Sequence, residues 1–309
     1  MRFGVPESGP MDRFARAAAN IALGRQAGST AVEISLGGLA VTCSSAQVTI
    51  AVCGGGFVVD HAGEQCTPWT VRTLVPGDTL TVSAGERGSW CYLAVAGDLV
   101  ARHWMGSTST HVRSGLGGGL VQAGDELVID APEFDLARHG PIEQPMIATP
   151  TNHLRVVLGP QLECFGPDTP GTLVDHAYRL SNAYDRMGVR LDGPNLDLAD
   201  ALAIPSTPIV RGSLQVAGDG VATLLLADHQ TTGGYPKIAT VISCDVARAS
   251  QLRSGDSVQF VAIDPASAID AVRAATTERS RQLSAIAERP GLVTQRLLAN
   301  NLVGGVFHY

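Results

Sequence analysis

Lys237 is the only lysine among the 22 Lys and Arg residues of this 309-residue sequence. It closes a polar segment that follows an apolar stretch and reads Asp228-His229-Gln230-Thr231-Thr232-Gly233-Gly234-Tyr235-Pro236-Lys237. Lysine carries a compact ammonium whose pKa moves with its surroundings, whereas the planar group of arginine stays charged. One retained lysine in such a segment is a candidate for a task that arginine cannot perform. The alternative is a solvated turn that kept one lysine by chance.

The segment that ends at Lys237 combines a carboxylate, an imidazole, an amide, hydroxyls and an ammonium. Its two glycines leave backbone N–H groups unhindered, which is typical of an anion-binding nest. Such a set can bind a carboxylate, bicarbonate or phosphate and stabilise charge that develops there. The alternative is a strand-turn-strand in which the polar side chains only cap backbone groups.

A second polar block, residues 181–194, holds Arg186 and Arg190. Residues four apart share a face in a helix and in a strand. Two neighbouring guanidinium groups can therefore hold a carboxylate through paired hydrogen bonds. The alternative is a surface hairpin on which Asp185 and Asp192 neutralise the two arginines.

Two shorter blocks lie in the first half of the chain. Val5-Pro6-Glu7-Ser8-Gly9-Pro10-Met11-Asp12 comes just before a predicted helix over 11–23, and helix N-termini favour anions. An ordinary helix cap is the alternative for this block. The hydroxyl run Gly106-Ser107-Thr108-Ser109-Thr110 predicts either a binding loop or a simple turn.

Composition excludes several classes of protein. The net charge of −7, without a block of like charges, excludes nucleic acid as a partner, and the apolar runs are too short to span a membrane. Six widely spaced cysteines without a CxxC pair predict free thiols in a cytoplasmic protein. The sequence has no P-loop, nucleophile elbow or HExxH motif. Lys237 follows a proline and precedes an apolar strand, so we expect no covalent biotin on this chain.

Strand patterns dominate between the ends of the chain. Alternating apolar residues predict strands at 47–52, 79–82, 90–95, 154–158, 223–226, 238–242 and 258–263. A Gly-Asp turn that feeds a strand is predicted at 76–80, 123–127 and 254–258. The Pro-rich stretch 131–153 predicts a linker between two related β lobes. Helices are predicted at 265–288 and 294–300.

The blocks described above resemble a known family, the allophanate hydrolase subunit 2 or biotin-dependent carboxyltransferase-like proteins, over nearly the whole chain. This family includes the C subunit of 5-oxoprolinase, the Kip antagonist protein and the carboxyltransferase region of urea carboxylase. The resemblance is strongest at 184–193 and 228–239, and it extends to 5–12, 106–110 and 301–306.

The resemblance implies a mainly β fold of two cyclophilin-like β-barrel lobes, with a few short helices and a helical C-terminal tail. The implied domains are an N-terminal lobe over 1–148, a second lobe over 149–265 and the tail over 266–309. The first strand of the family is missing here, so we expect either that the first lobe lacks it or that the start site is misplaced. The stretch 116–120 is shorter than the glycine loop of the family and lacks its arginine.

The function that the resemblance implies is that of the C subunit of an ATP-dependent 5-oxoprolinase in the cytoplasm. With a subunit-B-type partner, the chain would activate a lactam, 5-oxoproline, for ring opening to glutamate, and the complex would use ATP and Mg²⁺. One alternative is the carboxyltransferase component of a biotin-dependent carboxylase of urea or an amide. Another is a regulatory binding protein similar to the Kip antagonist.

The resemblance and the polar blocks together give a set of candidate site residues. Lys237 and Arg186 would neutralise substrate or phosphate charge, and Asp228 would transfer protons or hold Mg²⁺. No metal site of this chain's own is predicted. The candidate substrate- or anion-binding residues are Arg190, Gln215, Gln230, Thr231, Thr232, Gly233, Gly234, Tyr235, Ser8 and Asp12.

Overall fold

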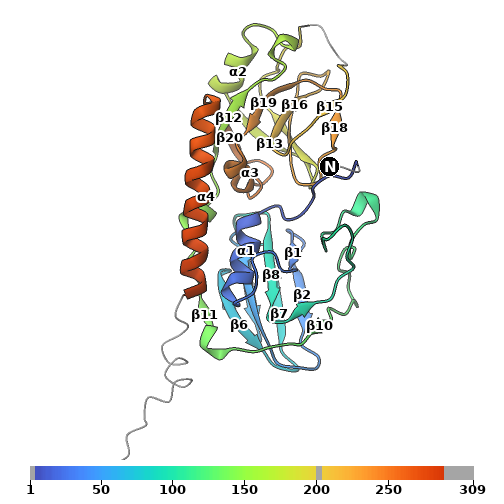
Figure 1. Cartoon of the computed structure of the whole chain (residues 1–309), viewed down its shortest axis with the longest axis vertical. Coiled ribbons are helices and arrows are strands. Elements are labelled where there is room, and N and C mark those ends of the chain that lie inside the picture. Colours follow the sequence, from blue (N-terminus) through green and yellow to red (C-terminus); the bar gives the residue numbers. More distant parts are fainter. Residues whose placement is uncertain (1–3, 200–203, 289–309) are drawn as a thin grey trace, which may run out of the picture. The chain divides into compact units, whose positions relative to one another are not determined.

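The computed structural model describes residues 4–199 and 204–288, whose helices and strands are drawn in Figure 1. Contacts between Cα atoms divide these residues into two compact units. The barrel unit comprises residues 4–13, 103–120 and 147–279, and the sheet unit comprises residues 14–102, 121–146 and 280–288. The domain boundary predicted between residues 148 and 149 stays a prediction.

A closed barrel of seven strands forms the centre of the barrel unit, in the order β12-β19-β16-β17-β14-β13-β20. Neighbouring strands are antiparallel except β12 and β20, which pair in parallel and close the barrel. The strands are β12 (His153–Leu158), β13 (Ala177–Tyr184), β14 (Gly188–Asp192), β16 (Ser213–Val216), β17 (Ala222–Leu225), β19 (Lys237–Val241) and β20 (Ser257–Ala262).

Burial alternates along β12, β13 and β20 of the barrel, whereas β16 is buried throughout. On β13 and β20, for example, the buried residues are Tyr178 and Leu180, and Val258 and Phe260. The rings of Tyr178 and Phe260 lie 5.8 Å apart, centroid to centroid. Successive side chains of a strand point to opposite faces, so every second residue enters the core. The other elements of this unit are α2 (Thr169–Asp175), α3 (Ser243–Ala249), the paired short strands β15 (Thr207–Pro208) and β18 (Thr232–Gly233), and α4 (Pro265–Glu288) as far as Arg279.

The sheet unit consists mainly of a five-stranded sheet, β1-β8-β3-β6-β11, and a four-stranded sheet, β2-β7-β4-β5. The strands of the first are β1 (Val32–Ile34), β3 (Val48–Gly54), β6 (Thr70–Leu74), β8 (Cys91–Val95) and β11 (Gly140–Pro141). Those of the second are β2 (Leu39–Thr42), β4 (Val58–His61), β5 (Glu64–Cys66) and β7 (Thr79–Ser83). The remaining elements of the described residues are α1 (Arg13–Ala22), β9 (Asp98–Leu99), β10 (Ile129–Asp130) and short 3-10 helices at Val112–Ser114, Leu136–Arg138, Met146–Ala148 and Leu162–Cys164.

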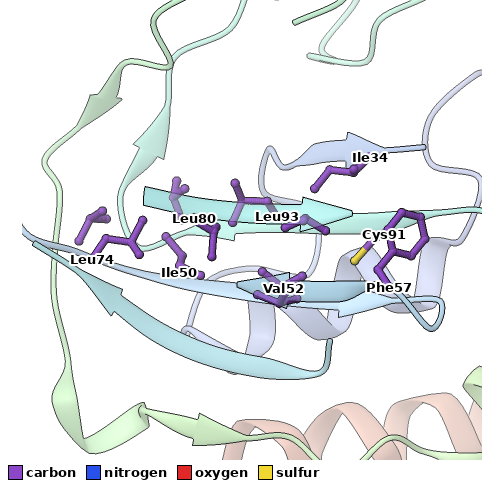
Figure 2. Packing of buried hydrophobic residues seen from close by; sticks show 12 residues of the cluster. Ile34, Ile50, Val52, Phe57, Leu74, Leu80, Cys91 and Leu93 are labelled. Atoms are coloured by element: carbon purple, nitrogen blue, oxygen red, sulfur yellow. The ribbon is translucent and has the colours of Figure 1, made fainter. Parts of the chain in front are cut away.

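Apolar side chains from both sheets pack into one core in the sheet unit. Figure 2 shows this packing, to which β3 and β8 of the first sheet and β4 and β7 of the second contribute. Burying such side chains is the main favourable term in folding. The twelve buried residues of this core are Ile34, Val48, Ile50, Val52, Phe57, Val59, Leu74, Leu80, Val82, Cys91, Leu93 and Val95.

The three predicted Gly-Asp turns share one structure. In each, the aspartate Oδ2 accepts the backbone N–H three residues earlier: Asp78 from Val75, Asp125 from Gln122 and Asp256 from Arg253. The glycine before each aspartate has a φ of +92° to +97°, which glycine adopts most readily. The strand predicted directly after Asp125 is wrong, because the next strand is the two-residue β10. The turns at Asp78 and Asp256 lead into β7 and β20, as predicted.

The mainly β fold, the closed barrel and the C-terminal helix confirm the fold class predicted from the sequence. The predicted strands in both units and the helices at 11–23 and 265–288 also form, with ends shifted by a few residues. All six cysteines are thiols, as predicted. The helix predicted at 294–300 and the block at 301–306 lie outside the described residues. No helix in the described part of the chain is long and apolar enough to cross a membrane.

Two neighbouring valines on β4 test the core of the sheet unit. Val59 is fully buried, whereas Val58 is 36% exposed. We expect Val59→Ala to lower the free energy of unfolding by roughly 2 kcal/mol, because it leaves a cavity between the sheets. Val58→Ala is the matched control, with an expected loss below about 0.5 kcal/mol. Urea denaturation of both variants measures the difference, and equal losses would contradict the packing.

Candidate functional site

A buried carboxylate, Asp228, lies at one end of the barrel, just after β17. Its Oδ2 accepts a hydrogen bond from Arg186 Nε at 2.8 Å, and its Oδ1 accepts one from Arg186 Nη2 at 3.0 Å. The hydroxyl of Ser8 donates to the same Oδ1 at 2.6 Å. We call Ser8, Gly9, Arg186 and Asp228 the Asp228 cluster. Two-point binding by a guanidinium is among the stronger charge-assisted hydrogen bonds in proteins.

The backbone around Arg186 explains how it reaches Asp228. Arg186 lies in the turn between β13 and β14, where Asp185 Oδ1 accepts the backbone N–H groups of Met187 and Gly188. The backbone N–H of Asp228 then donates to the carbonyl of Arg186 at 2.8 Å. The turn and the end of β17 are therefore joined through their backbones before their side chains pair.

The N-terminal segment is fixed to the same end of the barrel by its carbonyl groups. Arg186 Nη2 donates to the Gly9 carbonyl at 2.7 Å, and Arg211 donates to the carbonyls of Pro10 and Met11. Ser8 is buried and has a φ of +52°, which is uncommon for a residue other than glycine. Such backbone conformations persist where the surroundings hold them.

The predicted anion site at the N-terminus of the first helix is occupied by side chains of the chain itself. Asp12 is buried and accepts a hydrogen bond from Gln251 Nε2 at 2.9 Å. The hydroxyl run at 106–110 forms a turn, closed by the backbone pairing of Trp104 with Ser107. The carbonyl of Thr110 in this turn accepts a hydrogen bond from Ser8 Oγ at 3.3 Å.

A second group of polar residues lies around Lys237, at the start of β19. Lys237 is 4% exposed, and its Nζ donates to Thr207 Oγ1 at 2.6 Å. Its backbone N–H donates to Gln161 Oε1 at 3.0 Å. Gln215, Gln230, Gly233, Tyr235 and Lys237, together with Thr207 and Gln161, are called the Lys237 cluster below.

A shift in strand register sets the place of Lys237. Between β16 and β19, Leu214 pairs with Ala239 but Gln215 pairs with Lys237, so Ile238 has no partner on β16. Such an extra residue bends a strand and redirects a side chain, and bulges are frequent next to active sites. Lys237 and Ile238 are neighbours on this strand and both are buried.

Among the described residues, the ammonium of Lys237 has no acidic partner. Burial lowers the pKa of the Lys237 amine. Burying an unpaired charge is costly, so an anionic ligand or partial deprotonation is favoured there. Arginine could not respond in the second way.

Two glutamine side chains, Gln215 and Gln230, form a hydrogen bond with each other beside Lys237. Gln230 Nε2 donates to Gln215 Oε1 at 3.1 Å, and Gln215 Nε2 donates to the carbonyl of Tyr235 at 3.1 Å. A Cβ on Gly233 would lie 2.8 Å from Gln215 Nε2 and 2.6 Å from Ile209 Cδ1, so a larger residue there would require both side chains to move. With Gln215 fixed in this way, the oxygen of Gln230 is oriented as an acceptor.

The sequence-predicted residues separate into three groups. Ser8, Arg186 and Asp228 meet in one cluster, and Gln215, Gln230, Gly233, Tyr235 and Lys237 meet in the other. Arg190 lies apart from both, because it pairs with Asp219 at 2.6 Å, with both side chains about half exposed. The expectation that Arg186 and Arg190 act together is wrong, and neither Asp185 nor Asp192 forms a salt bridge with them in the described residues.

The expected backbone nest at 231–234 is also wrong. Thr232 and Gly233 form β18 and pair with β15, and neither Gly233 nor Gly234 has a positive φ. The carbonyl groups of Thr231 and Gly234 accept hydrogen bonds from the backbone N–H groups of Ile209 and Ile204. The backbone of this stretch is therefore used by a short β-ladder.

Several polar residues near the site carry no signal of their own in the sequence. Thr207 on β15 and the loop residues Gln161 and Arg211 reach it from separate parts of the chain, and no local spacing predicts them. His229 belongs to the polar segment, but its residue type alone does not set it apart there. It is 2% exposed, and its Nδ1 lies 2.6 Å from the Gln230 carbonyl oxygen.

The site does not fit a Mg²⁺ ion of its own. The described residues contain no group of three or more His, Cys, Asp or Glu side chains that could hold a metal. Both oxygens of Asp228 already accept hydrogen bonds from Arg186 and Ser8, so the expectation that it holds Mg²⁺ finds no support.

These features define a mainly β protein in which a neutralised carboxylate and an imidazole, which follow β17 at one end of a closed barrel, are connected through residues 228–237 to a buried ammonium at the start of β19. The family model described as "Carboxyltransferase domain, subdomain A and B" matches residues 3–262. The chain therefore belongs to this carboxyltransferase-domain family.

Relatives and solved structures extend this assignment. The C subunit of 5-oxoprolinase from Haemophilus influenzae is 30% identical over 265 residues, which cover 85% of this chain and 84% of the relative. The urea amidolyase of Lachancea kluyveri is 28% identical over 85% of this chain, which corresponds to 16% of that protein. The crystal structure of TTHA0988 matches with a TM-score of 0.74 and 32% identity over 84% of this chain, which spans 50% of the TTHA0988 chain.

Arg186 and Arg190 provide a matched pair for testing the Asp228 cluster. Arg186→Gln leaves the buried Asp228 carboxylate without its cation, so we expect a loss of about 3–5 kcal/mol in the free energy of unfolding. Arg190→Gln removes an exposed pair and is expected to cost less than about 1 kcal/mol. Chemical denaturation measures both losses. Adding Asp228→Asn to Arg186→Gln should restore part of the stability, and no recovery would argue against the pairing.

Proposed function

We propose that this chain is the C subunit of an ATP-dependent 5-oxoprolinase in the cytoplasm. It acts with a subunit-B-type partner to activate 5-oxoproline for ring opening to glutamate. The Haemophilus influenzae relative, named as the C subunit of 5-oxoprolinase, supports this proposal, because the match covers most of both chains. The observation that carries the proposal on the structural side is the buried amine of Lys237, which has no carboxylate beside it in the described residues.

The Lys237 cluster matches the chemistry of 5-oxoproline. This substrate carries one carboxylate and one lactam amide. In our proposal, the Lys237 ammonium neutralises the carboxylate or the negative charge that develops on the lactam oxygen, as a preorganised charge in a buried site does. The Gln230 amide, held by Gln215, offers both a donor and an acceptor for the lactam.

The Asp228 cluster holds the segment that carries these groups. The guanidinium of Arg186 is engaged by Asp228 and by the Gly9 carbonyl. In this proposal, Arg186 and Asp228 therefore position residues 228–237, and Lys237 neutralises the charge of the substrate. A displacement of about 1 Å in such groups can reduce the rate about 100-fold.

A carboxyltransferase component that works with a separate biotin carrier is the second candidate function. The name of the family model and the similarity to urea amidolyase favour it. The same ammonium and amide groups would then bind urea or an amide that accepts the carboxyl group. A third candidate, a regulator similar to the Kip antagonist, would bind its partner without using Lys237 at all.

A reconstituted complex tests these candidates. The purified chain is mixed with its subunit-B-type partner, and ATP hydrolysis and glutamate formation are measured with and without 5-oxoproline. We expect turnover only when both proteins and 5-oxoproline are present. Carboxyl transfer from an added carboxybiotin carrier to urea, without 5-oxoproline turnover, would instead establish the second candidate.

Lys237→Arg tests whether an amine is required at the centre of the cluster. It keeps a positive charge but brings a larger, planar group that cannot deprotonate. We expect it to lose most of the activity, by about 100-fold or more, as removal of a charge-stabilising group does. Lys237→Met should be equally inactive but at least as stable as the wild type, because it removes a buried unpaired charge. Normal turnover of Lys237→Arg would contradict the special role of the amine.

The pKa of the same amine can be measured directly. Because Lys237 is the only lysine, mass spectrometry assigns each lysine modification by an amine-directed reagent to it without ambiguity. The rate of modification should reach half its maximum at a pH below 10.5, the ordinary value, because burial lowers the pKa. Saturating 5-oxoproline should slow the modification in the complex. A midpoint at or above 10.5 would contradict the lowered pKa.

A further inference from the structure

His229 lies between the two clusters along the chain, after Asp228 and before Gln230. Its Nδ1 is 2.6 Å from the backbone carbonyl oxygen of Gln230. A carbonyl oxygen can only accept, so Nδ1 must carry the hydrogen of this bond. In the neutral imidazole, Nε2 then has no hydrogen and presents a lone pair. The backbone thereby fixes one tautomer of this side chain.

The environment of His229 keeps the imidazole neutral at neutral pH. Burial is the largest effect and lowers its pKa below the ordinary value of 6.5, and the charge of Arg211 acts in the same direction. The hydrogen bond to the Gln230 carbonyl and the charges of Glu7 and Asp228 act against this decrease. Asp228 already accepts hydrogen bonds from Arg186 and Ser8, and the balance favours the neutral form.

The second ring nitrogen of His229, Nε2, has no hydrogen-bond partner in the described residues. Although the residue is 2% exposed, Nε2 is not one of the buried side-chain nitrogens that lack a partner in the described residues, so this atom borders solvent and can be reached by water. A buried, neutral imidazole with one fixed nitrogen and one available lone pair has the form of a general base.

We propose that His229 is the general base of the site and takes a proton from the water that opens the lactam. This inference rests on the proposed function. The water oxygen forms a bond with the lactam carbon while one of its O–H bonds breaks and that proton passes to Nε2. The C–N bond then breaks, its electron pair goes to the ring nitrogen, and this nitrogen takes the proton from Nε2. The second proton of the water remains with the new carboxyl group.

The variant His229→Gln tests this role, with His176→Gln as the matched control. His176 is exposed and also uses Nδ1 against a backbone carbonyl, that of Thr172. We expect His229→Gln to lower kcat for glutamate formation by about 100- to 10,000-fold, the usual contribution of a general base, with little change in KM. His176→Gln should leave both constants unchanged.

Two further readouts distinguish a base from a residue that only supports the fold. Imidazole added to His229→Gly should restore part of the activity, which a structural defect would not allow. The wild-type rate should fall as the pH drops through the pKa of His229, below 6.5, because the protonated ring cannot accept a proton. In His229→Gln this decrease should be absent. Activity of His229→Gln within about threefold of the wild type, far less than the loss expected for a base, would overturn the proposal.

A measurement that does not depend on turnover completes the test. Nitrogen-15 NMR of the isolated chain should show the His229 ring with hydrogen on Nδ1 and none on Nε2 at pH 7. A ring protonated on Nε2 at that pH would overturn the proposal even if the complex is active. A wild-type complex that leaves 5-oxoproline intact would contradict the proposed function, and with it the reaction assigned to His229.

Discussion

The site depends on keeping one carboxylate out of water. An unpaired charge in a protein interior is strongly unfavourable, so Asp228 can be buried only if cationic and hydroxyl partners come to it. Its partners are Arg186, from the turn of another hairpin, and Ser8, from the N-terminal segment. The pairing therefore joins three distant parts of the sequence at one end of the barrel.

Residues 228–237 contain three ionisable side chains, and each of them has different hydrogen-bond partners. Asp228 is paired, His229 is buried with one nitrogen bound to a carbonyl, and Lys237 has no acidic partner in the described residues. Environments that differ over so short a distance are typical of sites that separate acid, base and charge-stabilising roles. The strand bulge before Ala239 and the missing Cβ of Gly233 preserve these differences.

Local patterns predicted the strands, the two long helices and the chemistry of the 228–237 segment, because alternation and composition act within a few residues. Local patterns could not predict which side chains contact one another in the folded chain. Arg190 has the same charge as Arg186 and a similar position in the sequence, but only the hairpin turn directs Arg186 toward Asp228. The nest expected at 231–234 failed because a distant strand, β15, takes up that backbone. Thr207 and Gln161 carry no local signal at all.

The pairing of β12 with β20, which closes the barrel, has a consequence for how the chain folds. β12 and β20 are the first and last strands of the barrel, and they pair directly, with His153 opposite Gln259. Every other barrel strand lies between them in sequence, so the cylinder cannot close on the ribosome until β20 has emerged. Before that, β12 and β13 each present an open edge, and such edges are prone to pair with other chains. Residues 228–237 precede β20 in the chain, so the segment that carries the site is synthesised before the barrel around it can close.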